Sequence, residues 1–302
     1  MIGSPRLQSE PEIISLERRG LKKGLYLIPS AFTAANIGMG FYAVMAALRG
    51  FQLSAVETDL VRASSYLDSA AKAIGWAVLF DMLDGRIARM TKTTTEIGIQ
   101  LDSIADVVTF GLAPAVLAYV WGYGASLEEG SNLHRLAWFL SFMYLMCGAF
   151  RLARFNVQAS RPRILAEGTI KVDKKSFVGL PIPVAGGLIA AIIHFAPVPL
   201  VAYGPERAAI YSALLMTLVG LLSILMVSTL RFSSFKTVGT RSRSMRTIIL
   251  AVAVGMLIYL YSQYVLLALV IAYIFHGLLS RVVGMFRRRP DLSESKMQTK
   301  ET

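Results

Sequence analysis

The chain has 302 residues, of which 55% are hydrophobic and 17% are charged, and its mean hydropathy is +0.55. Soluble domains carry closer to about 25% charged residues, so this composition excludes an ordinary soluble protein. Basic loops on one side of a membrane explain the net charge of +12, and we expect no nucleic-acid partner. Cys147 is the only cysteine, which excludes an intrachain disulfide and a multi-cysteine metal site.

Apolar runs recur along the chain, and each approaches the roughly 20 residues that a spanning helix needs. They predict an all-α fold, a polytopic membrane helical bundle of about eight transmembrane helices. The membrane domain covers 23–286, between a polar cytoplasmic leader at 1–22 and a disordered basic and polar tail at 287–302. The spans are predicted at about 25–48, 69–90, 100–123, 133–155, 177–195 and 207–230, with two more in 247–284 divided near Ser262 and Gln263.

Lysine and arginine alternate between the loops. They are frequent before the first span and in every second loop, whereas the intervening loops offer only Arg49, Arg62, Arg135 and Arg207. Because cytoplasmic loops carry the excess of positive charge, we expect both termini in the cytoplasm. We expect an integral protein of the cell membrane. Its charged and polar side chains at the ends of the spans are expected to face the cytoplasm.

The fifth span begins irregularly, with FVGLPIPVAGG at 177–187. Glycines and prolines interrupt regular helix, and irregular backbone is not tolerated where it faces lipid. We therefore expect this segment to line a cavity.

Four carboxylates lie at or near the ends of two apolar segments, at Asp81, Asp84, Asp102 and Asp106. Spacings of three and four residues place each pair on one helix face, and a hairpin of the second and third spans brings the pairs together. Carboxylates at close quarters cannot all stay ionised without compensating cations. Oxygen ligands without histidine or cysteine indicate Mg²⁺, Mn²⁺ or Ca²⁺, and neighbouring arginines suit phosphate. The pattern predicts a metal-dependent phosphate-chemistry site.

The alternative for any one carboxylate is an ordinary helix-end charge, paired with Arg86, Arg89 or Lys92. Four carboxylates at these spacings beside spanning segments favour the metal site. Polar residues on the first span extend it, because Thr33 and Asn36 lie one turn apart and could contact a nucleotide base or phosphate. Helix packing is the alternative for both.

Eight positions fit the pattern D-x2-D-G-x2-A-R-x8-G-x3-D-x3-D without a departure: Asp81, Asp84, Gly85, Ala88, Arg89, Gly98, Asp102 and Asp106. This pattern resembles the signature of the CDP-alcohol phosphotransferase family of integral membrane enzymes. In that family an alcohol displaces CMP from a CDP-linked substrate with the help of a divalent metal.

The resemblance implies a role for each matching residue. Asp81, Asp84 and Asp102 would bind the metal, which the resemblance implies to be two ions of Mg²⁺ or Mn²⁺. Asp106 would contribute to the metal site and act as the general base. Gly85 and Arg89 would contact the cytidine diphosphate, Arg89 through a phosphate.

Further stretches between about Leu25 and Lys236 resemble the serine-using branch of this family, among them IPSAFTAANIGMG, ADVVTFGLAP, RLARFNV and RFSSFK. Ser30 departs from the asparagine typical of that branch. The resemblance implies transfer of the phosphatidyl group from CDP-diacylglycerol to L-serine, by attack of the serine hydroxyl on the β-phosphate. It also implies a homodimer, and a groove between spans through which the lipid enters from the cytoplasmic leaflet.

A serine acceptor presents a carboxylate that arginine or lysine can hold. Six basic residues are candidates for binding serine or a phosphate, or are membrane anchors: Arg151, Arg154, Lys174, Lys175, Arg231 and Lys236. Arg151 and Arg154 share one face at the end of the fourth span, followed by Asn156. We expect His134 and His194 to be interfacial or packing residues on the far side, and His276 to be structural.

Two alternatives stay open at this point. The first is a phosphorylated acceptor, either glycerol 3-phosphate or an inositol phosphate. Such an acceptor needs a pocket with more basic residues, and the basic loop at 158–176 keeps this alternative open. A divalent-cation transporter would use the same aspartates but needs them near the bilayer midplane. The sequence leaves the preferred metal, and an ester or ether lipid, undecided.

Overall fold

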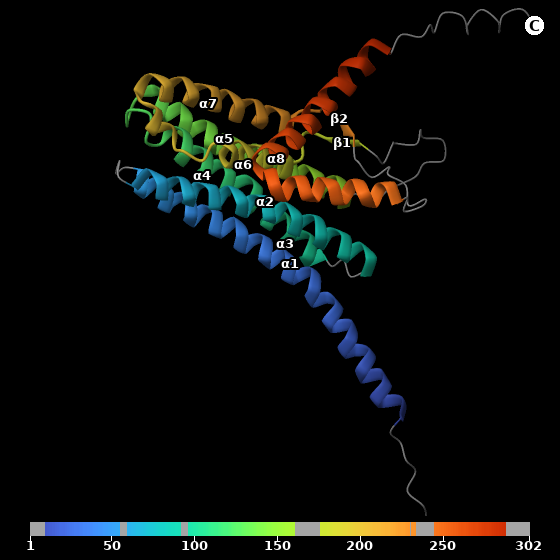
Figure 1. Cartoon of the computed structure of the whole chain (residues 1–302). Coiled ribbons are helices and arrows are strands. Elements are labelled where there is room, and N and C mark those ends of the chain that lie inside the picture. Colours follow the sequence, from blue (N-terminus) through green and yellow to red (C-terminus); the bar gives the residue numbers. More distant parts are fainter. Residues whose placement is uncertain are drawn as a thin grey trace, which may run out of the picture.

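The structure is a computed structural model that describes residues 10–54, 59–91, 96–160, 176–229, 231–233 and 245–287. Long helices lie side by side along a common direction, and the N-terminal part of α1 projects beyond the bundle (Figure 1). The helices are α1 Glu10–Ser54, α2 Leu60–Thr91, α3 Glu96–Asp106, η2 Val107–Leu112, α4 Ala113–Ala118, η3 Tyr119–Tyr123, α5 Asn132–Ser160, α6 Ile182–Phe195, η4 Leu200–Tyr203, α7 Pro205–Val227 and α8 Met245–Arg287. Two short strands, β1 Ser176–Val178 and β2 Arg231–Ser233, complete the described fold.

Within the described residues, five helical stretches are long and apolar enough to cross a membrane: Ala31–Ser54, Ile97–Tyr123, Asn132–Val157, Pro205–Val227 and Leu260–Gly277. They correspond to the first, third, fourth, sixth and eighth predicted spans, so a membrane helical bundle is confirmed. The fifth predicted span, α6, is apolar but has only 14 residues. The total of eight spans and the cytoplasmic placement of both termini stay predictions.

Small residues line the contact between α1 and α2. Ala43, Ala47, Ala70 and Ala77 are buried at 0% exposure, and a Cβ on Gly50 would lie 2.9 Å from Leu67 Cγ. Close backbone approach through small residues is the usual basis of helix association in a bilayer, where burial of apolar surface supplies little drive. The hairpin of α1 and α2 is thus a tightly packed base for the aspartates on α2.

The third predicted span is one helical rod interrupted by two π-helical segments, η2 and η3. A π turn leaves backbone groups without their usual partners, and such segments are frequent at functional sites. Here hydroxyls from neighbouring helices satisfy them: Tyr144 donates to the Phe110 carbonyl over 3.1 Å, and Ser212 to the Gly122 carbonyl over 2.7 Å. The first π segment begins directly after Asp106.

A short two-stranded antiparallel ribbon accompanies the helical bundle that the sequence predicts. Phe177 of β1 pairs with Phe232 of β2. Gly179 follows β1 at φ 83°, where a Cβ would lie 2.3 Å from the Met226 carbonyl oxygen. The Leu180 amide donates to the Leu225 carbonyl over 3.0 Å, so the irregular start of the fifth span is held against the end of α7. Strands of three residues are too short to leave an alternating pattern.

The final apolar run breaks at the predicted place. α8 contains one non-helical residue, Tyr261, at φ −135° and ψ 44°, directly before Ser262. The two halves of α8 diverge at this break (Figure 1). At the other end of the chain, α1 is a single helix from Glu10 to Ser54, so residues of the predicted leader and of the first span belong to one helix.

Candidate active site

The aspartates lie on two helices that both pack against α1. Asp81 lies in the C-terminal third of α2, while Asp102 and Asp106 lie one turn apart on α3. All three side chains are half-buried, and the Oδ1 atoms of Asp102 and Asp106 are buried. The side chains of Asp84 and Arg89 lie outside the described part of the structure, and Gly85 is half-buried. α2 also contacts η2, the segment that follows Asp106.

Asn36 faces this region from α1. Its side chain is 0% exposed, and both amide atoms lack a hydrogen-bond partner among the described residues. Thr109 Oγ1 donates to the Asn36 carbonyl over 3.0 Å, which ties Asn36 to the segment one turn beyond Asp106. Thr33, one turn before Asn36, is also buried. A buried amide without hydrogen-bond partners lowers the stability of the fold by about 1–3 kcal/mol. A role in binding a ligand therefore explains Asn36 better than a role in helix packing does.

The two arginines at the end of α5 have different surroundings. Arg151 is 7% exposed, its Nε makes no hydrogen bond within the described residues, and it lies in electrostatic range of Asp106. Arg154 instead donates from Nη1 to the Val227 carbonyl at the end of α7, over 3.2 Å. Arg151 therefore lies within electrostatic range of one of the aspartates, whereas Arg154 holds the end of α5 to the end of α7.

Ser103 is a site residue that the sequence did not single out. Asn156 on α5 donates from Nδ2 to Ser103 Oγ over 2.8 Å, and Ser103 lies between Asp102 and Asp106 on α3. Asn156 thus positions the aspartate helix. Its place within RLARFNV, two residues after Arg154, was the available signal.

The part of the chain that carries the aspartates, Asn36 and Arg151 is similar in sequence to known proteins. A sequence model described as CDP-alcohol phosphatidyltransferase matches residues 26–211, more than half of the chain and all four aspartates. The chain belongs to the CDP-alcohol phosphatidyltransferase family. The match also covers Asn36 and Arg151, and it ends within α7, before β2 and α8.

Relatives of this chain carry one shared name, CDP-diacylglycerol–serine O-phosphatidyltransferase. The protein from Helicobacter pylori (strain ATCC 700392 / 26695) is 33% identical over 221 residues, 71% of this chain and 75% of that protein. The protein from Methanocaldococcus jannaschii is 41% identical over 113 residues, 37% of this chain and 44% of that protein. The one from Saccharomyces cerevisiae is 33% identical over 162 residues, 54% of this chain and 51% of that protein.

Among the described side chains, which do not include Asp84, no three His, Cys, Asp or Glu residues lie close enough together to hold a metal ion. The carboxylate oxygens of the aspartates are nevertheless suitable ligands for the divalent metals that assist phosphoryl transfer. Buried carboxylate oxygens on Asp102 and Asp106 are the hard ligands that Mg²⁺ and Mn²⁺ prefer. The metal site stays a prediction.

The side chains of the remaining four basic candidates lie outside the described part of the structure. Lys174, Lys175 and Lys236 lie outside the described residues, and Arg231 belongs to β2, with its side chain also outside the described part. Because β2 pairs with β1, the backbone at Arg231 adjoins the start of the fifth span.

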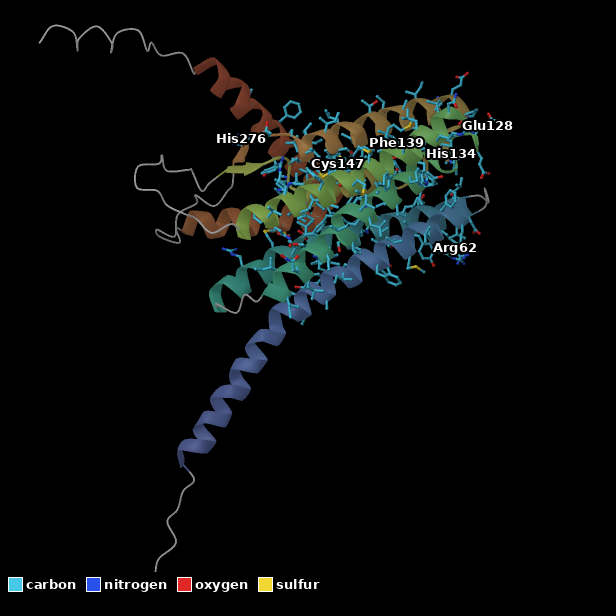
Figure 2. The ribbon with its side chains drawn as sticks, turned by 180° about the vertical axis from the view of Figure 1, so that it is seen from behind. Arg62, Glu128, His134, Phe139, Cys147 and His276 are labelled. Atoms are coloured by element: carbon cyan, nitrogen blue, oxygen red, sulfur yellow. The ribbon has the colours of Figure 1, made fainter. Side chains whose placement is uncertain are left out.

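An apolar cavity of about 540 Å³ lies between α5 and α7. It is lined by Phe139, Leu140, Met143, Cys147, Gly220, Ser223, Ile224, Val227 and Ser228. Figure 2 shows Phe139 and Cys147 along the α5 side of this region. One end of the cavity reaches Val227, the residue to which Arg154 is bound, so the cavity adjoins the basic end of α5.

The three histidines differ in their surroundings. His134 bonds to the Tyr119 hydroxyl over 2.8 Å and lies at the same end of the bundle as Arg62 and Glu128, as expected of an interfacial residue (Figure 2). His276 is exposed on α8. His194 is buried and hydrogen-bonded to two other helices, so it is a packing residue and not an interfacial one.

Proposed function

We propose that this chain transfers the phosphatidyl group of CDP-diacylglycerol to L-serine and releases CMP, giving phosphatidylserine. Membership of the CDP-alcohol phosphatidyltransferase family and the shared name of its relatives support this reaction. The structural observation that carries it is that Arg151, a buried cation, lies within electrostatic range of Asp106, the carboxylate proposed as the base. An acceptor with a carboxylate and a hydroxyl can engage both.

In this proposal Arg151 binds the carboxylate of serine through charge-assisted hydrogen bonds. That contact orients the serine hydroxyl toward Asp106, which takes its proton as the oxygen attacks the β-phosphorus. The bond from the β-phosphorus to the oxygen of CMP breaks, and CMP leaves. Asn36 and Thr33 contact the cytidine or a phosphate, and Gly85 and Arg89 contact the diphosphate.

Asp81, Asp84, Asp102 and Asp106 would hold the divalent metal, Mg²⁺ or Mn²⁺ and two ions. Bound there, it supplies positive charge that polarises the phosphoryl oxygens. The acyl chains of the lipid would occupy the apolar cavity between α5 and α7, since its lining is hydrophobic and it adjoins the arginines. Arg231, Lys174, Lys175 and Lys236 would add positive charge for the phosphates.

The proposed setting is the cell membrane, with the aspartates and both termini on the cytoplasmic side and a homodimer as the working form. The C-terminal ends of α2 and α5 lie toward the same end of the bundle as β1 and β2 (Figure 1), and basic residues follow both ends in the sequence. Positive charge gathered at one end of a bundle supports a cytoplasmic location for that end.

The test measures CMP release by the purified full-length protein with CDP-diacylglycerol and Mn²⁺ or Mg²⁺ across a panel of alcohols. Serine should give the highest rate, and Asp106→Asn should lower it by about 10²–10⁴-fold. Asp59→Asn is the control, because Asp59 is a carboxylate directly before α2, at the other end of that helix from Asp81 and Asp84. Release only with glycerol 3-phosphate or an inositol phosphate would refute the serine acceptor, and full activity in Asp106→Asn would remove the proposed base.

A further inference from the structure

The apolar cavity between α5 and α7 lies within two stretches that are long enough to cross a membrane, Asn132–Val157 and Pro205–Val227. Of its lining residues, Phe139 and Ile224 are 50% and 68% exposed, whereas Ser223 is 4% exposed. The cavity is therefore a hollow that opens on the outer surface of the bundle. In a bilayer that surface faces hydrocarbon, so acyl chains of lipids are the molecules nearest to the opening.

Two close approaches of α5 and α7 mark the ends of the cavity. A Cβ on Gly220 of α7 would lie 3.6 Å from Leu140 Cδ2 of α5, and a Cβ on Gly148 of α5 would lie 3.8 Å from Met226 Sδ of α7. The two helices thus run side by side in the same direction. The lining on α7 extends from Gly220 to Ser228, which is about 12 Å along a helix. We call the end at Leu140 and Gly220 the distal end.

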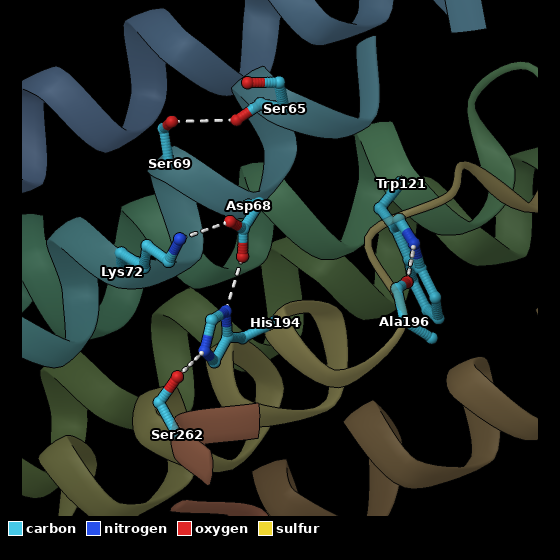
Figure 3. Close-up of polar contacts among 8 residues, drawn as sticks. All are labelled: Ser65, Asp68, Ser69, Lys72, Trp121, His194, Ala196 and Ser262. Atoms are coloured by element: carbon cyan, nitrogen blue, oxygen red, sulfur yellow. Dashed lines mark hydrogen bonds and ion pairs between the residues drawn. The ribbon is translucent and has the colours of Figure 1, made fainter. Parts of the chain in front are cut away.

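The two hydroxyls of the lining are directed back to their own helix. Ser223 and Ser228 donate to carbonyls four and three residues earlier on α7, over 2.8 and 2.7 Å. Elsewhere in the bundle polar side chains meet between helices, as where His194 bonds to Asp68 and Ser262 (Figure 3). A polar ligand in the cavity would lose its hydrogen bonds with water, so this lining suits an apolar chain.

Positive charge lies beyond the other end of the cavity. Arg154 Nη1 donates over 3.2 Å to the carbonyl of Val227, which belongs to the lining. Arg151, four residues beyond Cys147 on the same face of α5, lies within electrostatic range of Asp106. An apolar hollow with cations at one end is complementary to an amphiphile whose head is anionic. The diphosphate and acyl chains of CDP-diacylglycerol have this character.

We propose that the cavity receives one acyl chain of CDP-diacylglycerol and that Gly220 limits the length of that chain, which makes Gly220 a specificity residue for the donor. The ester end of the chain lies toward Arg154 and its methyl end toward Leu140. The cavity volume of about 540 Å³ is that of a site for one ligand of drug size, about 300–1,000 Å³. The family match ends at residue 211, so Gly220 lies beyond it. This inference rests on the proposed function, which names the donor.

The first test fills the distal end with Gly220→Leu, a change that favours helix. The ratio of kcat/KM for dipalmitoyl over dioctanoyl CDP-diacylglycerol should fall by about tenfold, the effect of removing room for a methylene group or more from an apolar pocket. Gly75→Leu is the matched control, because Gly75 is a half-buried helical glycine outside the lining and its Cβ would have nothing within 4 Å. Equal ratios in the two variants would overturn the limit on chain length.

The second test uses Cys147, which lines the cavity and is the only cysteine of the chain. Its half-buried thiol can be labelled with a maleimide in the full-length protein in detergent, without any substitution. Dipalmitoyl CDP-diacylglycerol should slow the labelling by about threefold or more, because a ligand in a pocket is mostly covered by it. CDP-glycerol, which has the same head without acyl chains, should leave the labelling rate unchanged.

Three results of the labelling experiment would overturn the inference. Unchanged labelling with the dipalmitoyl donor would show that no chain enters the cavity, and protection by CDP-glycerol would show that the head group alone shields the thiol. Equal protection by dipalmitoyl phosphatidylcholine would show a surface that takes any lipid. Labelling needs no turnover, whereas a chain that releases no CMP from either donor with serine would refute the proposed function, so the two failures are distinguishable.

Discussion

Thr109 Oγ1 donates a 3.0 Å hydrogen bond to the carbonyl of Asn36, across 73 positions of sequence. The bond joins α1 to the π segment that begins after Asp106. It is possible because Gly40, one turn beyond Asn36, lets the two backbones approach: a Cβ there would lie 2.5 Å from Thr109 Oγ1 and 2.9 Å from its Cα. The placement of Asp106 relative to α1 thus depends on a glycine that carries no chemistry.

We predict that Gly40→Ala destabilises the protein by about 1–3 kcal/mol, because the added methyl group separates α1 from η2. The apparent melting temperature in detergent should fall, and CMP release should fall with it. Gly38→Ala is the matched control, since a Cβ at Gly38 has nothing within 4 Å. Equal melting temperatures for the two variants would contradict this reading of the contact.

We predict that Asn36→Leu separates stability from activity. Leucine has a similar volume and removes two buried polar atoms that lack partners among the described residues, so the free energy of unfolding should rise by up to about 1 kcal/mol. If the amide binds substrate, CMP release should fall by about tenfold or more. Thermal unfolding and CMP release on the same preparation test both halves, and a less stable variant would show that the amide serves packing.

We predict that Arg151→Gln reduces the preference for serine over ethanolamine, which lacks the carboxylate. The ratio of kcat/KM for the two alcohols should fall by about 10- to 100-fold, as expected for hydrogen bonds to a charged group. Arg154→Gln is the control, because Arg154 donates to the Val227 carbonyl and its loss should lower the melting temperature without changing the ratio. The reverse pattern would exchange the roles of the two arginines.

We predict that removal of divalent metal abolishes CMP release and that Mg²⁺ or Mn²⁺ restores it. Asp81→Asn and Asp102→Asn should raise the metal concentration needed for half-maximal activity, because each removes a charged ligand. Full activity in the presence of excess EDTA would contradict the metal assignment.

Much of the fold was predictable because its signals are local. Apolar runs predicted the spans that the structure confirms, and the polar pair Ser262–Gln263 marked the break that falls at Tyr261. The glycines and prolines after Phe177 predicted an irregular start, which the structure shows as β1 and Gly179. The ribbon itself was missed, because β1 pairs with residues more than fifty positions away.

The sequence by itself determined the membrane bundle, the spacing of the four aspartates and the family, since each depends on residues close together in the chain. Only the tertiary structure decided that Arg151 lies within electrostatic range of Asp106 while Arg154 binds the end of α7. It also decided that His194 hydrogen-bonds both to Asp68, 126 positions earlier in the chain, and to Ser262. Such contacts depend on how helices pack and rotate against one another, and periodicity along one helix does not specify that.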